Sequence, residues 1–220
     1  MKVEILNSLN DVAVRSLELL GGPRVAVSGG TTFAALFRHW APTVKARASS
    51  GEALRFFVVD ERKVAFEDPL CNWKSCVEDL LVPAGLADQK AHFVTTAADY
   101  AALLAREFGA APVVFDQVYL GMGEDGHTAS LFPGKPSLDD LTSVVLDVTD
   151  SPKPPAERVT LGMGSIRAAR AVITIALGAG KVDMVRRLRE GDLTLPITRA
   201  MHGHPDATLI LDRAAAGLSD

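Results

Sequence analysis

The chain has 220 residues, of which 48% are hydrophobic, and a formal net charge of −4. This length suits one large domain or two small ones, with enough apolar residues for a packed core. The acidic balance argues against a nucleic-acid-binding protein, and no apolar run is long enough to span a membrane. Because Met1–Leu6 also lacks the apolar core of a signal peptide, we expect a cytoplasmic protein.

Strand-like and helix-like segments alternate from end to end. Strands are predicted at residues 3–6, 24–28, 54–59, 92–95, 113–120, 143–148, 158–161, 171–177 and 208–211. Helices are predicted at 9–20, from the 29–32 loop to about 40, at 72–81, 97–108 and 180–190, and a surface loop at 41–53. This alternation is typical of βαβ units and of a mainly parallel sheet covered on both faces. The pattern resumes after the proline-rich segment 151–155, so residues 1–220 are expected to form a single domain.

The segment Ser28-Gly-Gly-Thr-Thr32 lies between a predicted strand and a predicted helix. Its amides at Gly29, Gly30 and Thr31 could point at one anion, and the helix N-terminus adds partial positive charge. The segment lacks the lysine of a Walker loop and the spacing of a dinucleotide site. It could equally be an ordinary helix cap, so a simple phosphate cradle and a cap both remain open.

A charged segment, Asp60-Glu-Arg62, follows the predicted strand 54–59. Because parallel strands end at one edge of the sheet, these side chains should emerge beside the glycine loop. Arginine can bind carboxylate or phosphate oxygens in a bidentate manner. The alternative is a surface salt bridge, which contributes little to stability.

The segment Val118–Gly134 begins as a buried strand and continues into glycines at 121, 123 and 126. Glycine allows the backbone to take positive φ angles or to lie close to a ligand. His127 lies in this loop and is the candidate catalytic base, with Asp125 as the residue that could orient its ring or brace the turn. The alternative is a histidine that only hydrogen-bonds a tight turn.

Two further cations are candidates for substrate binding. Arg158 opens a predicted strand, and Lys181 follows Leu177-Gly-Ala-Gly at the start of a predicted helix. An ammonium at a helix N-terminus opposes the helix dipole, so Lys181 is better explained if an anion lies nearby; a solvated lysine is the alternative.

No metal site is expected. His202 and His204 have no accompanying set of ligands at a recognisable spacing, and Cys71 and Cys76 fit neither a redox pair nor a zinc framework.

Together these motifs resemble the 6-phosphogluconolactonase family. The resemblance runs from residue 28 to residue 213 and includes the Ser-Gly-Gly-Thr loop, Asp60-Glu-Arg62, Gly121–Gly134, Arg158-Val-Thr-Leu161, Gly180-Lys181 and Leu195-Pro196. It implies a three-layer, Rossmann-like α/β/α fold shared with glucosamine-6-phosphate deaminase. It also implies a metal-free hydrolase of a sugar-phosphate lactone. No cofactor is expected, and the protein is expected to be a monomer or a homodimer. Cys71 stands where the family usually has serine, and Lys63–Phe66 replaces a proline-rich stretch; both fall in the loop expected to line the sugar side of the pocket.

Glucosamine-6-phosphate deaminase is the nearest alternative that the resemblance leaves. That enzyme carries a carboxylate immediately before the proline that follows Asp-Gly-His, whereas this chain has Phe132 there. The deaminase also has an aromatic residue where this chain has Arg62. A non-catalytic sugar-phosphate sensor is a further alternative, although the chain shows no basic helix-turn-helix segment.

These residues suggest a mechanism. The phosphate would dock on the amides of residues 29–31 with Arg158 and Lys181, and Asp60 is a further candidate for substrate binding. His127 would take a proton from the attacking water, and Arg62 or glycine amides would stabilise the oxyanion.

Overall fold

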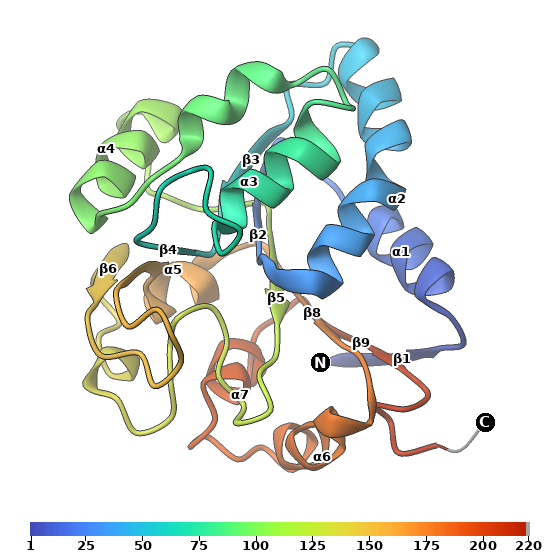
Figure 1. Ribbon diagram of the computed structural model, residues 1–220. Coiled ribbons are helices and arrows are strands. Elements are labelled where there is room, and N and C mark those ends of the chain that lie inside the picture. The colour runs from blue at the N-terminus through green and yellow to red at the C-terminus, as the bar shows by residue number, and fades with distance from the viewer. Residues whose placement is uncertain (219–220) are drawn as a thin grey trace.

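The computed structural model describes residues 1–218 (Figure 1). A six-stranded sheet runs through the centre in the order β1-β9-β8-β5-β2-β3, and every neighbouring pair is parallel. The strands are β1 (Lys2–Leu6), β2 (Arg24–Val27), β3 (Arg55–Val58), β5 (Gln117–Gly121), β8 (Ala171–Ala176) and β9 (Ala207–Asp212). The predicted parallel α/β architecture is therefore confirmed.

Helices cover both faces of this sheet. Figure 1 shows α1 (Leu9–Glu18), α2 (Gly30–Ser49) and α3 (Asn72–Cys76) on one side, and α5 (Met163–Ala168), α6 (Val182–Arg189) and α7 (Pro196–Met201) on the other. The helix α4 (Ala97–Phe108) packs near the end of a second sheet. No helix among residues 1–218 is long and apolar enough to cross a membrane.

The second sheet is small and antiparallel, with the order β4-β7-β6. Its strands are β4 (Asp60–Arg62), β7 (Arg158–Leu161) and β6 (Val145–Val148). The chain enters it from β3 through a single residue, Val59. The Val59 amide donates to Val27 O (3.0 Å) in the parallel sheet, and its carbonyl accepts from Leu161 N (2.8 Å) in the antiparallel sheet. One peptide segment therefore ties the two sheets together.

The predicted surface loop at 41–53 is wrong. The helix α2 continues to Ser49 with Pro42 inside it. Its buried residues, Phe33, Leu36, Phe37, Trp40, Ala41 and Val44, recur at helical spacing past the predicted end. Burial of this apolar stripe outweighs the hydrogen bond that proline cannot donate, since most helix stability in proteins comes from packing.

The predicted strand at 92–95 is also wrong. Residues 87–92 form a 3₁₀ helix instead. His92 is buried, with its Nδ1 2.9 Å from Phe56 O and its ring stacked on Phe57. The side chain thus fixes the segment beneath the sheet, rather than pairing it as a strand. Two short helices, α5 and α7, were not predicted, and β5 begins four residues later than the predicted strand 113–120.

Candidate active site

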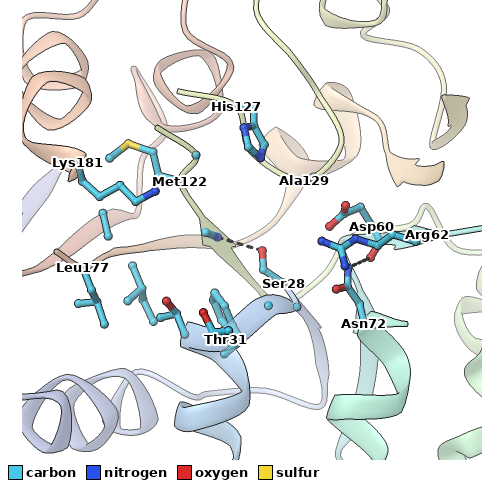
Figure 2. A pocket seen from close by; sticks show the side chains of 18 of the residues that line it. Ser28, Thr31, Asp60, Arg62, Asn72, Met122, His127, Ala129, Leu177 and Lys181 are labelled. Atoms are coloured by element: carbon cyan, nitrogen blue, oxygen red, sulfur yellow. Dashed lines mark hydrogen bonds between the residues drawn. The ribbon is translucent and has the colours of Figure 1, made fainter. Parts of the chain in front are cut away.

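The candidate site is a pocket at the carboxyl ends of β2 and β5 (Figure 2). The chain leaves β2 toward β3 on one side, whereas from β5 it continues toward β8 on the other. Ligands of open α/β sheets bind at such a reversal of direction. The loops that follow the two strands are joined there, because Gly121 N donates to Ser28 Oγ at 3.0 Å.

The loop after β2 presents a helix N-terminus to the pocket. Gly29 is the N-cap of α2 and provides no side-chain hydrogen bond, so the first-turn amides have no capping side chain. A β-carbon on Gly29 would lie 2.0 Å from Asn72 Oδ1, and Gly30 has a φ of +87°. Both positions therefore require glycine. Gly29, Gly30 and Thr31 all line the pocket, as the phosphate-cradle interpretation expected.

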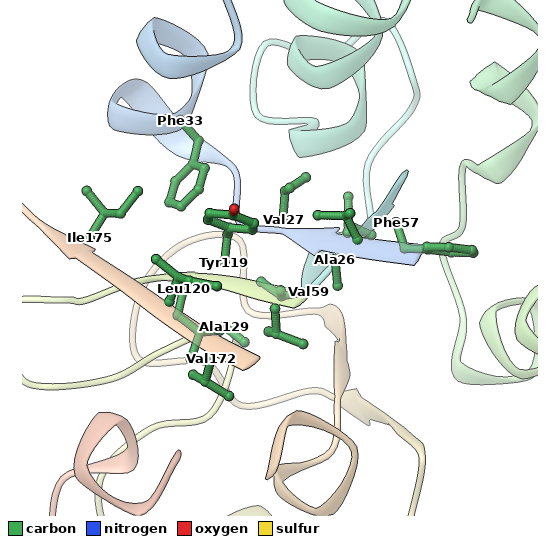
Figure 3. Packing of buried hydrophobic residues seen from close by; sticks show 14 of the residues in the cluster. Ala26, Val27, Phe33, Phe57, Val59, Tyr119, Leu120, Ala129, Val172 and Ile175 are labelled. Carbon is green, nitrogen blue, oxygen red and sulfur yellow. The ribbon is translucent and has the colours of Figure 1, made fainter. Parts of the chain in front are cut away.

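The floor of the pocket is the hydrophobic core itself. Phe33, Ile175 and Ala129 line the pocket and also belong to the buried cluster that Figure 3 shows between β2, β5 and β8. Densely packed side chains at this position hold the loops above them in place.

His127 reaches the pocket from the loop after β5 (Figure 2). Its Nδ1 lies 2.5 Å from Asp125 Oδ1, and its backbone amide donates to the same oxygen at 3.3 Å. Asp125 therefore both orients the ring and braces the turn. Since a carboxylate only accepts hydrogen bonds, Nδ1 carries the proton and Nε2 keeps its lone pair.

Gly123 makes room for this pair. A β-carbon at position 123 would lie 2.0 Å from His127 Nδ1 and 2.6 Å from Asp125 Oδ1. Any side chain there would displace the imidazole from the carboxylate.

The ionisation states of His127 and Asp125 are those that a general base at His127 requires. Burial lowers the pKa of His127, and the charge of nearby Lys153 lowers it further. The hydrogen bond and charge of Asp125 act in the opposite direction and raise this pKa. Burial acts against ionisation of Asp125, but the hydrogen bond and charge of His127 outweigh it and lower the pKa of that carboxyl. The imidazole is therefore neutral, and the carboxylate charged, at pH 7.

The opposite wall of the pocket comes from the antiparallel sheet. Strand alternation turns Asp60 and Arg62 toward the pocket and Glu61 away from it. Asp60 Oδ2 accepts a 2.6 Å hydrogen bond from Ser130 Oγ, and Arg62 Nη1 donates to Leu70 O at 2.8 Å. The predicted meeting of this segment with the glycine loops at one sheet edge is confirmed.

Glu61 is fully buried under the pocket and has a structural role that the sequence did not reveal. Its carboxylate accepts hydrogen bonds from the backbone amides of Arg62 (2.7 Å), Asn72 (2.8 Å) and Trp73 (2.6 Å). Burial raises the pKa of Glu61 to about 7, although the three amides favour the carboxylate. The side chain thereby fixes the start of α3 against β4.

The family resemblance placed the loop that carries Cys71 on the sugar side of the pocket, but the Cys71 side chain does not line the pocket. Its Sγ donates to Glu61 Oε2 at 3.4 Å and accepts from Lys74 N at 3.3 Å. The neighbouring Asn72 does line the pocket and donates to Asp60 O at 2.9 Å.

Arg158 lies in the pocket wall and is 4% exposed. Its Nη2 donates to Lys153 O (2.9 Å) and Pro154 O (3.3 Å), and its Nε donates to Pro155 O (3.1 Å). Its Nη1 lies 4.0 Å from Asp60 Oδ2. Arg158 therefore supplies positive charge to this wall and also holds the 151–155 loop.

Lys181 lines the far side of the pocket, directly before α6 (Figure 2). Burial lowers the pKa of its ammonium, and Glu124 opposes this shift. The candidate residues from five separate segments thus surround one pocket, with Asp125 just behind His127.

A parallel sheet with an uncapped helix N-terminus and a His–Asp pair at its switch point is typical of an enzyme that acts on a small anionic substrate. The chain belongs to the family described as glucosamine-6-phosphate isomerases/6-phosphogluconolactonase, whose model matches residues 3–210. It is 34% identical to 6-phosphogluconolactonase of Rattus norvegicus, over 94% of this chain and 86% of the rat protein. For 6-phosphogluconolactonase of Mycobacterium tuberculosis the identity is 31%, over 89% and 85%.

Solved structures share this fold. The 6-phosphogluconolactonase from Trypanosoma cruzi superimposes with a TM-score of 0.81 at 26% identity, covering 98% of this chain and 96% of that one. A monomeric glucosamine-6-phosphate deaminase superimposes with a TM-score of 0.72 at 20% identity, covering all of both chains, and shows the common fold alone.

Proposed function

We propose that this chain hydrolyses 6-phospho-D-glucono-1,5-lactone to 6-phospho-D-gluconate, in the oxidative pentose phosphate pathway, with His127 as general base. The family and its lactonase relatives support the reaction. The observation that carries the mechanism is the position of the His127–Asp125 pair on the same pocket as the free N-terminus of α2.

The phosphate would bind at the amides of Gly29, Gly30 and Thr31, where the helix dipole favours an anion. Lys181 would add an ammonium contact from the far wall. Arg158 would act mainly through its charge, since its N–H groups are largely engaged with carbonyl oxygens.

The lactone carbonyl would then lie near His127. Nε2 takes a proton from a water molecule as the water oxygen attacks the carbonyl carbon. Arg62 or the glycine amides stabilise the resulting oxyanion. When the ring C–O bond breaks, the imidazolium returns its proton to the departing ring oxygen, and the new carboxylic acid loses a proton to solvent. Asp60 is left to contact the sugar hydroxyls.

The direct test follows this released proton. With freshly prepared lactone, the protein should accelerate acidification far above the spontaneous rate, which is the blank. Binding of the lactone without acceleration would support a sugar-phosphate sensor instead. Ammonia release from glucosamine 6-phosphate would support the deaminase alternative. The presence of Phe132 where the deaminase has a carboxylate argues against that alternative; the centroid of its ring lies 4.9 Å from that of the His127 ring.

The substitution Lys181→Ala is expected to raise KM for the phosphorylated lactone by about 10- to 100-fold, the usual effect of losing one charge-assisted hydrogen bond. Hydrolysis of unphosphorylated gluconolactone should change little. Lys45→Ala is the matched control, because Lys45 is exposed near the far end of α2. Equal effects on both lactones would contradict a phosphate contact.

The pH dependence should follow the imidazole. Because the base form is required and the pKa of His127 lies below 6.5, kcat/KM should rise with pH on the acid side and level off before neutrality. Initial rates corrected for spontaneous opening would measure this profile. An acid limb centred above pH 7 would contradict the assignment.

A further inference from the structure

The loop at residues 151–155 contributes a cation that the proposed mechanism does not use. Lys153 Nζ lies 3.6 Å from Asp125 Oδ1 and 3.5 Å from His127 Nδ1. These atoms belong to the side of the imidazole that faces away from the proposed reaction. Lys153 is not among the residues that line the pocket, and its contacts are with the His127–Asp125 pair.

Several hydrogen bonds fix the backbone that carries Lys153. Its carbonyl accepts from the buried Arg158 (Nη2, 2.9 Å) and from Ser151 Oγ (2.8 Å). Its amide donates to Ser151 Oγ at 3.2 Å. A lysine on a freely moving surface loop would have no preferred anion, whereas this backbone directs the side chain toward Asp125.

We propose, building on the general-base role above, that Lys153 is a positioning residue that shares the Asp125 carboxylate with His127 and limits the basicity of the imidazole. The same oxygen, Asp125 Oδ1, contacts both His127 Nδ1 and Lys153 Nζ. A cation there offsets part of the negative charge that would otherwise favour the imidazolium. The enzyme thereby keeps His127 unprotonated further into the acidic range.

The other charged groups around the imidazole act in known directions. Asp125 on its own loop and Asp60 on β4 favour the imidazolium, and Lys153 on the 151–155 loop disfavours it. Arg62, Arg158 and Lys181 line the same pocket as His127. Of the cations among the described residues, Lys153 is the one with a recorded contact to a ring nitrogen of His127.

The test is an NMR titration of the His127 ring, assigned by comparison with His127→Gln, in the intact wild-type protein and in Lys153→Met. Methionine keeps a similar unbranched chain and removes the charge. The His127 titration should move to higher pH by about half a unit or more, as expected for a partly exposed charge at this distance. Below both pKa values, kcat/KM should then fall by at least about threefold, with little change at pH 8.

Two variants serve as controls. Lys153→Arg keeps the charge and should retain the wild-type titration. Lys135→Met removes the same charge from a lysine paired with Asp150 at 2.6 Å, and should leave the His127 titration unchanged. The side chain of Lys153 is 45% exposed, so the thermal unfolding midpoint should stay near that of wild type.

An unchanged His127 titration in Lys153→Met would overturn the inference, as would a rise in KM without any shift of the acid limb, which would make Lys153 a substrate contact. A shifted titration with no matching change in the rate profile would uphold the role of Lys153. That last result would instead contradict the assignment of His127 as the base.

Discussion

Replacement of His127 by alanine is expected to lower kcat by about 10²–10⁴-fold, the usual contribution of a positioned general base. KM should change much less, because the cradle at the start of α2 and Lys181 would remain to bind the phosphate. The effect arises from loss of the one described side chain that presents a free imidazole nitrogen to the pocket. Proton release at saturating lactone, corrected for spontaneous opening, measures it.

His202→Ala is a suitable control, since this histidine is exposed, directly follows α7 and does not line the pocket. Asp125→Asn tests the orientation of the ring and should cause a smaller loss of kcat. If His127→Ala turned over the lactone at the wild-type rate, His127 would have no part in the chemistry, and the base would have to be sought elsewhere.

Replacement of Glu61 by alanine is expected to lower the free energy of unfolding by about 3–5 kcal/mol. The substitution leaves the amides of Arg62, Asn72 and Trp73 without their acceptor in a buried place, and each such group costs at least about 1 kcal/mol. For a chain of this length the melting temperature should fall by roughly 6–20 °C. Thermal unfolding followed by circular dichroism measures the change.

Glu78→Ala removes an exposed carboxylate from the π-helical turn Val77–Leu81, which follows α3, and should change the melting temperature little. Glu61→Gln keeps one acceptor oxygen but turns an NH₂ group toward the backbone donors, so an intermediate loss is expected. A melting temperature of Glu61→Ala equal to that of wild type would contradict the structural role of Glu61.

The local sequence pattern was sufficient to predict most strands of the parallel sheet. The strand at Arg158–Leu161 and the helix at Ala97–Phe108 have the predicted bounds, because apolar spacing and flanking turn residues agree there. The pairing of β7 with β4 and β6 in a separate antiparallel sheet could not be predicted, since pairing depends on contacts far apart in sequence. The error at residues 41–53 arose from treating small residues and a proline as a loop, although the buried stripe of α2 continues through Val44.

The site residues were predictable where they follow a strand. Asp60, Arg62, His127 and Lys181 all come soon after strands, and strand ends converge at one edge of a parallel sheet. Lys153 gave no such signal, because it lies in a proline-rich loop 26 residues from His127. Its nearness to Arg158 in the chain was the available clue, and only the three-dimensional structure shows that Arg158 holds that loop.

The single-residue connection at Val59, between β3 and β4, has a consequence for the substrates that the site can bind. The cradle at Gly29 follows β2, whereas Asp60 and Arg62 begin the antiparallel sheet, and Val59 is hydrogen-bonded to both sheets. The backbone spacing between these two walls is therefore set by covalent geometry and main-chain hydrogen bonds. We therefore expect the fixed spacing between the cradle and the Asp60–Arg62 wall to limit the length of the phosphorylated sugars that fit between them.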